Sequence, residues 1–335
     1  MEQVIKQLFA KIELGTVSSV TKQTGGLINK LYRAETSTGT YAVKALNPKI
    51  MERPDAYSNH TFAERVAKVV LENGISAVPA IEFNGTSVQE FQGKFFLIYK
   101  WNEGKVIPRN EITLSNCEKV GKVLAQIHNV DFKELGNRKH ETLSLSIDWG
   151  KYLALAKQQK AEWLDLYERN LGKLVEWEKI ANAAHKKLTE YKVCHCDMDI
   201  KNILWVDNEP CVIDWESTQI YSPAIELVEY SFCWSLDRDY KMDTDKVKAF
   251  CRAYMANKKI DIGEIKIAVS ANYSGKLNWL GYNIKRALGI ESSDEQETKI
   301  ANGYLRYAMD ELFKYDEQKD KLMRSILEVT QIETA

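Results

Sequence analysis

Two short apolar runs separated by a turn place the tightest constraint on how this chain can fold. The first run is Ile203–Val206, the turn is Asp207–Pro210, and the second run is Cys211–Ile213. Apolar runs joined by a short polar turn are typical of a β-hairpin. Because the strands of a hairpin run antiparallel, Asn202 before the first run and Asp214 after the second are expected at the same end.

Four polar residues around this hairpin occur in an order suited to phosphoryl transfer. They are His195, Asp197, Asn202 and Asp214. One carboxylate can orient a nucleophilic hydroxyl, while an amide oxygen and a second carboxylate can hold the metal ion that neutralises phosphate charge. A lone His or Asp is usually a solvated or capping residue. The order and spacing of all four together favour a catalytic site.

The same residues resemble the catalytic and metal-binding segments of the kinase-like small-molecule phosphotransferases, the aminoglycoside phosphotransferase and choline kinase group. The resemblance implies that Asp197 acts on the substrate hydroxyl and that Asn202 and Asp214 bind Mg²⁺. The phosphoryl donor is then ATP, with GTP as an alternative. The resemblance also implies that His195 supports this loop and that Glu226 holds it in place.

Several departures from the protein-kinase pattern argue against a protein kinase. Cys196 stands where protein kinases have Arg, Asp199 where they have Lys, and Trp215-Glu216 where they have Phe-Gly. These departures, and the lack of an Ala-Pro-Glu segment in the sequence, fit the small-molecule branch. Asp199 is an additional carboxylate, for which a second metal, a cationic substrate and simple solvation remain open.

The order of the predicted elements agrees with an α+β, bilobal, protein-kinase-like fold. Strands are predicted over Val17–Gln23, Leu31–Thr36, Tyr41–Leu46 and Lys94–Tyr99, and helices over Met1–Leu14, Ser115–His128 (opened by a capping box), Ile147–Gln158, Ala161–Lys187 and much of Ala224–Ile332. The resemblance implies a small, β-rich nucleotide-binding lobe over residues 1–100 and an inter-lobe linker over 101–105. A large, mainly helical lobe with the catalytic loop and acceptor site is expected over 106–335.

The small lobe contains candidate nucleotide-binding residues. Gly25 and Gly26 lie between the first two predicted strands, where backbone without side chains can approach phosphates closely, although such a pair is often just a turn. Lys44 alternates with Val43 along its strand and therefore faces the opposite side. The resemblance assigns Lys44 to the α/β-phosphates of the nucleotide.

Glu64 has two possible roles in the sequence. The resemblance pairs it with Lys44, whereas the spacing Thr61-x-x-Glu64 also fits a capping box at a helix start. Tyr99 and Trp101 lie at the predicted linker, where the family binds adenine through backbone groups. Their rings could equally pack between the lobes.

The acceptor site is expected in the helical lobe. Aromatic and acidic side chains there suit a cationic ligand through cation–π and ionic contacts, whereas an arginine suits an anionic or sugar acceptor. Aromatic residues at helical spacing are also common in protein cores. The candidates are Asp199, Trp234, Asp237, Trp279 and Arg286.

Composition excludes several other classes of protein. The 335 residues are 44% hydrophobic, and 46 Lys+Arg against 47 Asp+Glu leave a formal charge of −1, which gives no global attraction to nucleic acid or to an anionic membrane.

The N-terminal segment is amphipathic rather than a signal peptide, and the six cysteines suggest reduced thiols. Alternation of Cys194, His195 and Cys196 along a strand argues against zinc. A cytoplasmic monomer is therefore expected.

Together these observations predict an enzyme, a phosphotransferase that uses ATP and Mg²⁺ to phosphorylate a hydroxyl group on a small molecule. An aminoglycoside-type antibiotic or an aminosugar is the first expectation for the acceptor. Two alternatives remain: a kinase for choline-like or other sugar and alcohol acceptors, and a non-catalytic kinase-like nucleotide-binding protein. A pseudo-enzyme commonly lacks one member of the set Lys44, Asp197, Asn202 and Asp214, and this sequence has all four.

Overall fold

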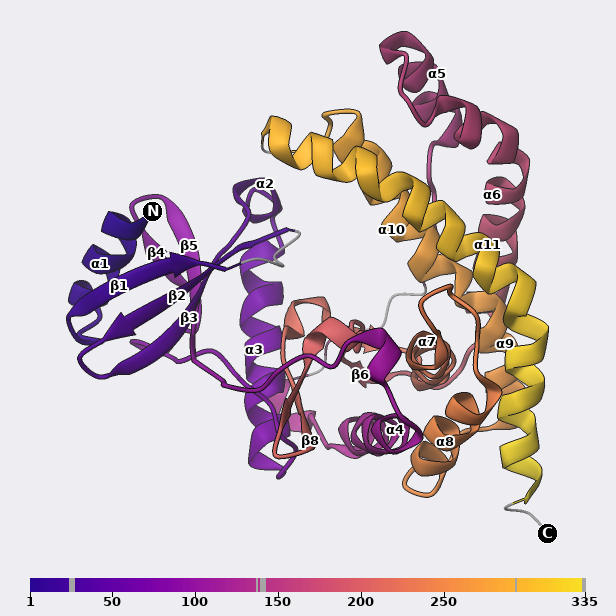
Figure 1. Ribbon diagram of the computed structural model, residues 1–335, viewed down its shortest axis with the longest axis horizontal. Coiled ribbons are helices and arrows are strands. Elements are labelled where there is room, and N and C mark those ends of the chain that lie inside the picture. Colours follow the sequence, from indigo (N-terminus) through magenta and orange to yellow (C-terminus); the bar gives the residue numbers. More distant parts are fainter. Residues whose placement is uncertain (24–27, 137, 139–142, 293, 333–335) are drawn as a thin grey trace. The chain divides into compact units, whose positions relative to one another are not determined.

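The computed structural model describes residues 1–23, 28–136, 138, 143–292 and 294–332 (Figure 1). Gly25 and Gly26 lie outside the described residues. The chain forms two compact units that do not follow a single cut in the sequence. The first comprises Met1–Val106, Val130–Asn137 and Lys201–Gln219, and the second comprises Ile107–Asn129, Arg138–Ile200 and Ile220–Ala335.

An antiparallel sheet is the centre of the first unit. Among the described residues it has five strands in the order β1-β2-β3-β5-β4. The strands are β1 (Val17–Lys22), β2 (Lys30–Thr36), β3 (Gly39–Ala45), β4 (Gln89–Phe91) and β5 (Lys94–Lys100). The four strands predicted from the sequence are confirmed. The three-residue strand β4 was not predicted because it is too short to show an alternating pattern.

The two faces of this sheet carry different structures. Helix α1 (Glu2–Lys11) places Ile5 and Phe9 in a core cluster with Val43 and other residues of β2, β3 and β5. The sheet alternation turns Lys44 to the other face, as predicted. The first unit also contains α2 (Pro48–Met51), α3 (Ala56–Glu72) and the 3-10 turn η2 (Lys133–Leu135).

The predicted hairpin is confirmed. Strand β7 (Ile203–Val206) follows the 3-10 turn η3 (Ile200–Asn202) and pairs with β8 (Glu209–Val212). The turn residues Asp207 and Asn208 both have left-handed backbone, with φ of 49° and 65°, as a tight hairpin turn requires. The Ile213 N–H donates to the Asn202 carbonyl at 3.0 Å. The hairpin therefore closes beside the two predicted metal ligands.

The second unit is mainly helical. Its elements are η1 (Arg109–Glu111), α4 (Leu114–Asn129), α5 (Trp149–Gln159), α6 (Leu164–His185), β6 (Lys192–Cys194), β9 (Gln219–Tyr221), α7 (Pro223–Ser235), α8 (Thr244–Met255), α9 (Ile262–Ala271), α10 (Tyr273–Ala287) and α11 (Glu295–Ile332). Helix α4 packs on α7 and α8, and the long helix α11 runs along α8, α9 and α10 (Figure 1). The predicted helices are confirmed, with boundaries shifted by a few residues.

Two predicted helix starts are wrong. The reciprocal capping bonds of α4 join Thr113 and Asn116, whose side chains each accept the other's backbone N–H, so the cap is not at Ser115. Helix α3 begins at Ala56, and Thr61 inside it donates its hydroxyl to the Tyr57 carbonyl. Thr61 is therefore no cap. In the described part of the chain no helix is long and apolar enough to cross a membrane.

Candidate active site

Lys44 meets the segment after the hairpin in the first unit. Its Nζ lies 2.6 Å from Asp214 Oδ1 and 3.3 Å from Glu216 Oε2, and its side chain is 11% exposed. Burial alone would lower the pKa of Lys44, but the two carboxylates raise it above the ordinary value. The lysine is therefore a fixed positive charge, which is what a phosphate-binding group needs.

Asp214 and Asn202 offer oxygen atoms from the two strands of the hairpin, at the same end of it. Asp214 has left-handed backbone, with φ of 64°, which turns the chain from β8 into the 3-10 turn η4 (Trp215–Ser217). A carboxylate and an amide oxygen are hard donors of the kind that Mg²⁺ prefers. Lys44 Nζ contacts the same carboxylate at 2.6 Å. The donor set fits the expected ion.

Glu64 does not pair with Lys44, contrary to the first of the two sequence expectations. Its Oε2 accepts the Ala80 N–H at 2.6 Å and its Oε1 accepts the Tyr99 hydroxyl at 2.7 Å. Burial raises the pKa of Glu64, although both hydrogen bonds and Lys44 oppose that rise. Both carboxylate oxygens are engaged elsewhere, while Asp214 and Glu216 take the lysine.

The sequence analysis missed three contributors to this site. Asn29 donates to Glu216 Oε2 at 2.6 Å and accepts the Asn47 N–H at 2.8 Å. Glu216 thus links the lysine to the segment before β2. Buried His60 on α3 has its pKa lowered to about 4, by burial first and then by Lys44. Glu216 could have been found in the sequence as a carboxylate two positions after the predicted metal ligand Asp214.

Tyr99 and Trp101 lie at the end of β5. Tyr99 is buried, and its ring centroid lies 5.9 Å from the Lys44 ammonium. Trp101 stacks under the Arg33 guanidinium at 5.1 Å and donates its backbone N–H to Thr40. Both side chains support the sheet in this structure, so their contribution to nucleotide binding stays a prediction.

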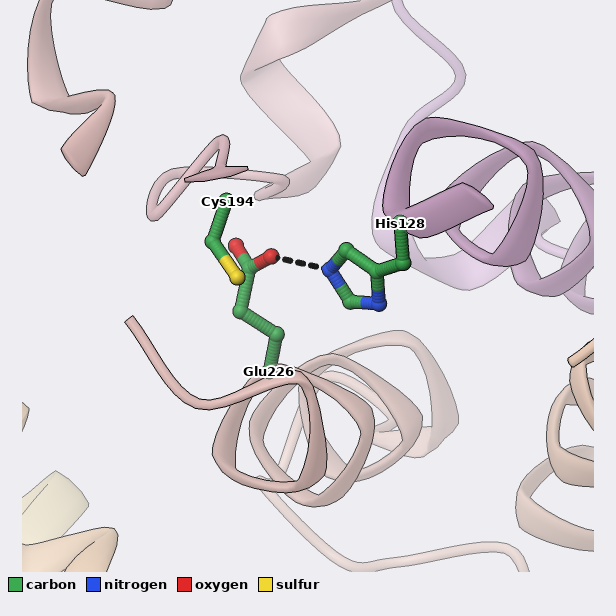
Figure 2. A group of neighbouring side chains, drawn as sticks. All are labelled: His128, Cys194 and Glu226. Carbon is green, nitrogen blue, oxygen red and sulfur yellow. Dashed lines mark hydrogen bonds and ion pairs between the residues drawn. The ribbon is translucent and has the colours of Figure 1, made fainter. Parts of the chain in front are cut away.

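The predicted catalytic loop, in the second unit, is held by a buried network of hydrogen bonds (Figure 2). Glu226 Oε1 accepts the Cys196 N–H at 2.6 Å, and Glu226 Oε2 lies 2.6 Å from His128 Nε2. On the other side of the imidazole, Nδ1 lies 2.7 Å from the Tyr254 hydroxyl. Burial would raise the pKa of Glu226, but His128 and the Cys196 N–H hold it below the ordinary value.

This network also gathers three residue types that can bind metals, His128, Cys194 and Glu226. Figure 2 shows the carboxylate turned to the imidazole, with the thiol beside it. Both oxygens of Glu226 already accept hydrogen bonds, and Cys194 Sγ contacts the Tyr221 carbonyl at 3.5 Å. Burial raises the pKa of the Cys194 thiol well above the ordinary value. Because Glu226 and Cys194 already contact other groups of the protein, the arrangement fits a positioning network better than a metal site.

Asp197 follows directly in this loop. Its N–H donates to His195 Nδ1 at 3.1 Å, and the preceding Cys196 has left-handed backbone with φ of 60°. On the other side, the Trp234 indole donates to the Met198 carbonyl at 2.9 Å. Contacts on both sides thus fix the backbone around Asp197.

The predicted acceptor residues differ in their exposure and their contacts. Trp234 is fully buried and supports the loop, and Arg286 is 1% exposed against the Tyr282 ring, so neither offers surface to an acceptor in this structure. Exposed Asp237 accepts two backbone N–H groups in a turn. Trp279 is half-buried near Tyr282.

Asp199 is not simply solvated. Its Oδ1 accepts the Ile200 N–H at 2.5 Å and lies 3.8 Å from Cys233 Sγ. Its charge also contributes to the raised pKa of Arg109, whose guanidinium donates to the Cys233 carbonyl at 2.7 Å. The structure therefore places Asp199 among charged and polar groups of the second unit.

The β-sheet N-terminal region and the mainly helical C-terminal part match the kinase-like phosphotransferase fold. The phosphotransferase enzyme family matches the chain over residues 19–257, and the chain belongs to this family. It is a small-molecule phosphotransferase that acts on hydroxyl groups. Comparison with curated protein sequences gives no match.

Solved structures with the same fold include antibiotic and alcohol kinases. Spectinomycin phosphotransferase in complex with ADP and spectinomycin has a TM-score of 0.71 and 14% identity, over 94% of this chain and 98% of that one. Choline kinase from Cryptosporidium parvum has a TM-score of 0.58 and 14% identity, over 91% of each chain. Ethanolamine kinase from Plasmodium vivax has a TM-score of 0.56 and 16% identity, over 87% and 81%. At these identities the likeness establishes the fold.

Proposed function

We propose that this protein transfers the γ-phosphoryl group of ATP to a hydroxyl of an aminoglycoside-type antibiotic or aminosugar, with Mg²⁺ as cofactor. The observation that carries the proposal is the 2.6 Å ion pair of Lys44 and Asp214, residues far apart in the sequence. It joins the expected phosphate-binding lysine to the expected metal-binding carboxylate. A non-catalytic protein would have little reason to keep both beside Asn202.

Each residue then has one role in the reaction. Lys44 binds nucleotide phosphate oxygens, and Asn202 and Asp214 hold Mg²⁺, which when bound would neutralise the phosphates. Asp197 orients the acceptor hydroxyl and takes its proton as the new phosphate–oxygen bond forms and ADP leaves. The Glu226 network holds the backbone next to Asp197 and so limits the movement of its carboxylate.

The two parts of the chain divide this work. We assign nucleotide binding to residues 1–100, the linker to 101–105, and the acceptor and catalytic loop to 106–335. Nucleotides in complexes of fold relatives, ADP with spectinomycin phosphotransferase and AMP-PNP with Ca²⁺ in amicoumacin kinase, support nucleotide and divalent metal use. GTP stays an alternative to ATP.

An antibiotic-like acceptor is favoured by the spectinomycin phosphotransferase fold match, which has the highest TM-score of the three relatives described. Choline and ethanolamine kinases share the fold and support a small amino alcohol as the second candidate. The six cysteines, all in the described part of the chain, are free thiols, which supports a cytoplasmic enzyme. We expect a monomer.

A nucleotide-consumption screen tests activity and acceptor together. Purified protein with Mg²⁺ and ATP or GTP is offered aminoglycosides, aminocyclitols, amino sugars, choline, ethanolamine and neutral polyols. Acceptor-dependent ADP or GDP release that disappears in Asp197→Asn is the expected result. Failure of every hydroxylated acceptor, with nucleotide binding intact, would favour the non-catalytic alternative.

A further inference from the structure

Asn29 is a buried amide that joins two separate segments of the first unit. Its Nδ2 donates to Glu216 Oε2 at 2.6 Å, and its Oδ1 accepts the Asn47 N–H at 2.8 Å. The residue is 8% exposed, so water competes little for either hydrogen bond. An amide side chain offers a donor and an acceptor on neighbouring atoms, whereas a carboxylate offers acceptors alone. Asn29 therefore uses both of its polar atoms to connect η4, which contains Glu216, to the segment after β3.

The Glu216 oxygen that accepts the Asn29 amide also contacts the predicted phosphate-binding lysine. Lys44 Nζ lies 3.3 Å from Glu216 Oε2. Lys44 belongs to β3, and Asn47 lies shortly after the same strand. The contacts therefore form a ring that runs from Lys44 through Glu216, Asn29 and Asn47 back to the strand of the lysine. Such a ring fixes the ammonium group relative to its own strand.

Asn47 holds the segment before β2 by a second hydrogen bond. Its Nδ2 donates to the Ile28 carbonyl at 3.3 Å, and its Oδ1 accepts the Lys49 N–H at 2.9 Å at the start of α2. Asn47 is itself buried. Two hydrogen bonds thus attach Ile28 and Asn29 to the segment after β3. Because this attachment sets the position of the Asn29 side chain, Glu216 is the group that Asn29 aligns.

The two other carboxylates considered as partners of Lys44 are less suited to this part. Both oxygens of Glu64 accept hydrogen bonds from other groups. Asp214 lies 2.6 Å from the lysine, but the proposed function assigns it to Mg²⁺. Glu216 is also the more enclosed of the two acidic partners, with its side chain 19% exposed against 30% for Asp214. Glu216 is therefore the carboxylate that stays with the lysine when Asp214 serves the metal.

We propose that Asn29 is a positioning residue for nucleotide binding, which acts through Glu216 to hold the Lys44 ammonium group in place for the phosphates. The inference rests on the proposed function, in which Lys44 binds nucleotide phosphate oxygens. In the sequence Asn29 stands three positions after Gly26, one of the predicted phosphate-binding residues. A nucleoside without phosphates makes no use of Lys44, so its affinity does not depend on Asn29. Nucleoside di- and triphosphates do depend on it.

Isothermal titration calorimetry of Asn29→Asp tests the proposal. The substitution keeps an oxygen that can accept the Asn47 N–H, but it replaces the donor to Glu216 by a second oxygen, so that two carboxylates face each other. With Mg²⁺ present, the Kd for ADP rises about ten- to a hundredfold, whereas the Kd for adenosine changes by less than about twofold. The rise is smaller without Mg²⁺, because Asp214 is then available to the lysine. GDP and guanosine are measured alongside as a second pair of ligands.

Asn59→Asp is the matched control. Asn59 Nδ2 donates to Asp55 Oδ2 at 2.9 Å in an exposed hydrogen bond of α3, in the same unit. The substitution therefore also sets two carboxylates against each other, but in solvent, and the Kd for ADP stays at the wild-type value. Asn29→Ser removes the amide without adding a charge, and it gives the same comparison of ADP with adenosine if Asn29→Asp does not fold.

A double-mutant cycle shows whether Asn29 acts through Glu216. Glu216→Gln weakens ADP binding in the same way as Asn29→Asp. The double variant binds ADP no more weakly than the weaker of the two single variants, because all three lose the same interaction. Losses that add in the double variant would mean that Asn29 acts independently of Glu216, and they overturn the inference.

Two further results overturn the role of Asn29. One is a Kd for ADP in Asn29→Asp within about twofold of the wild type. The other is an equal loss of adenosine affinity, because a loosened fold weakens both ligands alike. A wild-type protein that binds nucleotide but phosphorylates no acceptor removes the proposed transfer reaction, while the binding measurements still decide the role of Asn29. A wild-type protein that binds no nucleotide removes both.

Discussion

The crossing of α4 and α8 in the second unit leads to a stability prediction whose magnitude can be estimated from the structure. Gly121 of α4 faces Phe250 of α8, and a Cβ added at Gly121 would lie 2.3 Å from the Phe250 carbonyl oxygen and 3.0 Å from its carbon. Favourable non-bonded contacts are near 3.5–4.0 Å. In Gly121→Ala the new methyl group is therefore more than about 1 Å too close to backbone, which cannot rotate away as a side chain can.

Helices α4 and α8 must separate to accommodate this methyl group, which disturbs the packing of Cys117 and Leu124 on the same helix. Overpacking of this kind typically costs about 1–3 kcal/mol. Alanine recovers about 0.5–1 kcal/mol through its better helix propensity, which does not offset the clash. A net loss of about 1–2 kcal/mol lowers Tm by about 2–8 °C in a unit of this size.

Gly172→Ala is the matched control for this experiment. Gly172 is exposed on α6 of the same unit, and a Cβ there would meet no atom within 4 Å. This variant gains about 0.5–1 kcal/mol from helix propensity and rises in Tm. Calorimetry and urea unfolding of both variants give the free energies of unfolding. A Gly121→Ala protein as stable as Gly172→Ala would refute the close crossing of α4 and α8.

Four further substitutions test the active site. Asp197→Asn lowers turnover about 10²–10⁴-fold with nucleotide affinity nearly unchanged by calorimetry, and turnover within threefold of wild type would exclude its role as the base. Asp214→Ala abolishes the Mg²⁺ dependence of nucleotide binding, and an unchanged dependence would make Asp214 merely structural. Glu226→Gln replaces the carboxylate oxygen that lies 2.6 Å from His128 Nε2 by an amide N–H and lowers kcat more than the affinity for either substrate; a drop in Tm alone would limit Glu226 to stability. In His60→Gln the free energy of unfolding decreases less steeply with falling pH than in the wild type, because the pKa of His60 is lowered from 6.5 to about 4. Stabilisation by neutral His60 is complete above pH 6.5 and is lost as pH falls toward 4, by up to about 3 kcal/mol, and identical acid profiles of the two proteins would contradict this.

The sequence by itself determined the elements and the local chemistry. Strand alternation placed Lys44 on the face opposite to Val43, and the two apolar runs around Asp207 specified a hairpin that closes Asn202 toward Asp214. These features depend only on residues a few positions apart. Their backbone preferences can therefore be inferred directly from the sequence. The spacing of the catalytic residues was equally local, and it sufficed to indicate the family.

Only the tertiary structure decided which charged groups meet. Lys44 pairs with Asp214 and Glu216 rather than with Glu64, although Glu64 is nearer in the sequence. In the same way, Trp234 became a buried support of the loop instead of an acceptor contact.

The contacts of Lys276 with Glu229 and Glu311 were likewise absent from the sequence reasoning, since the three residues come from three separate helices. The physical reason is that a side chain's partner is set by how whole helices and strands pack. Packing depends on the shapes and charges of many residues that are distant along the chain. The periodicity of a short stretch of sequence carries no information about these residues.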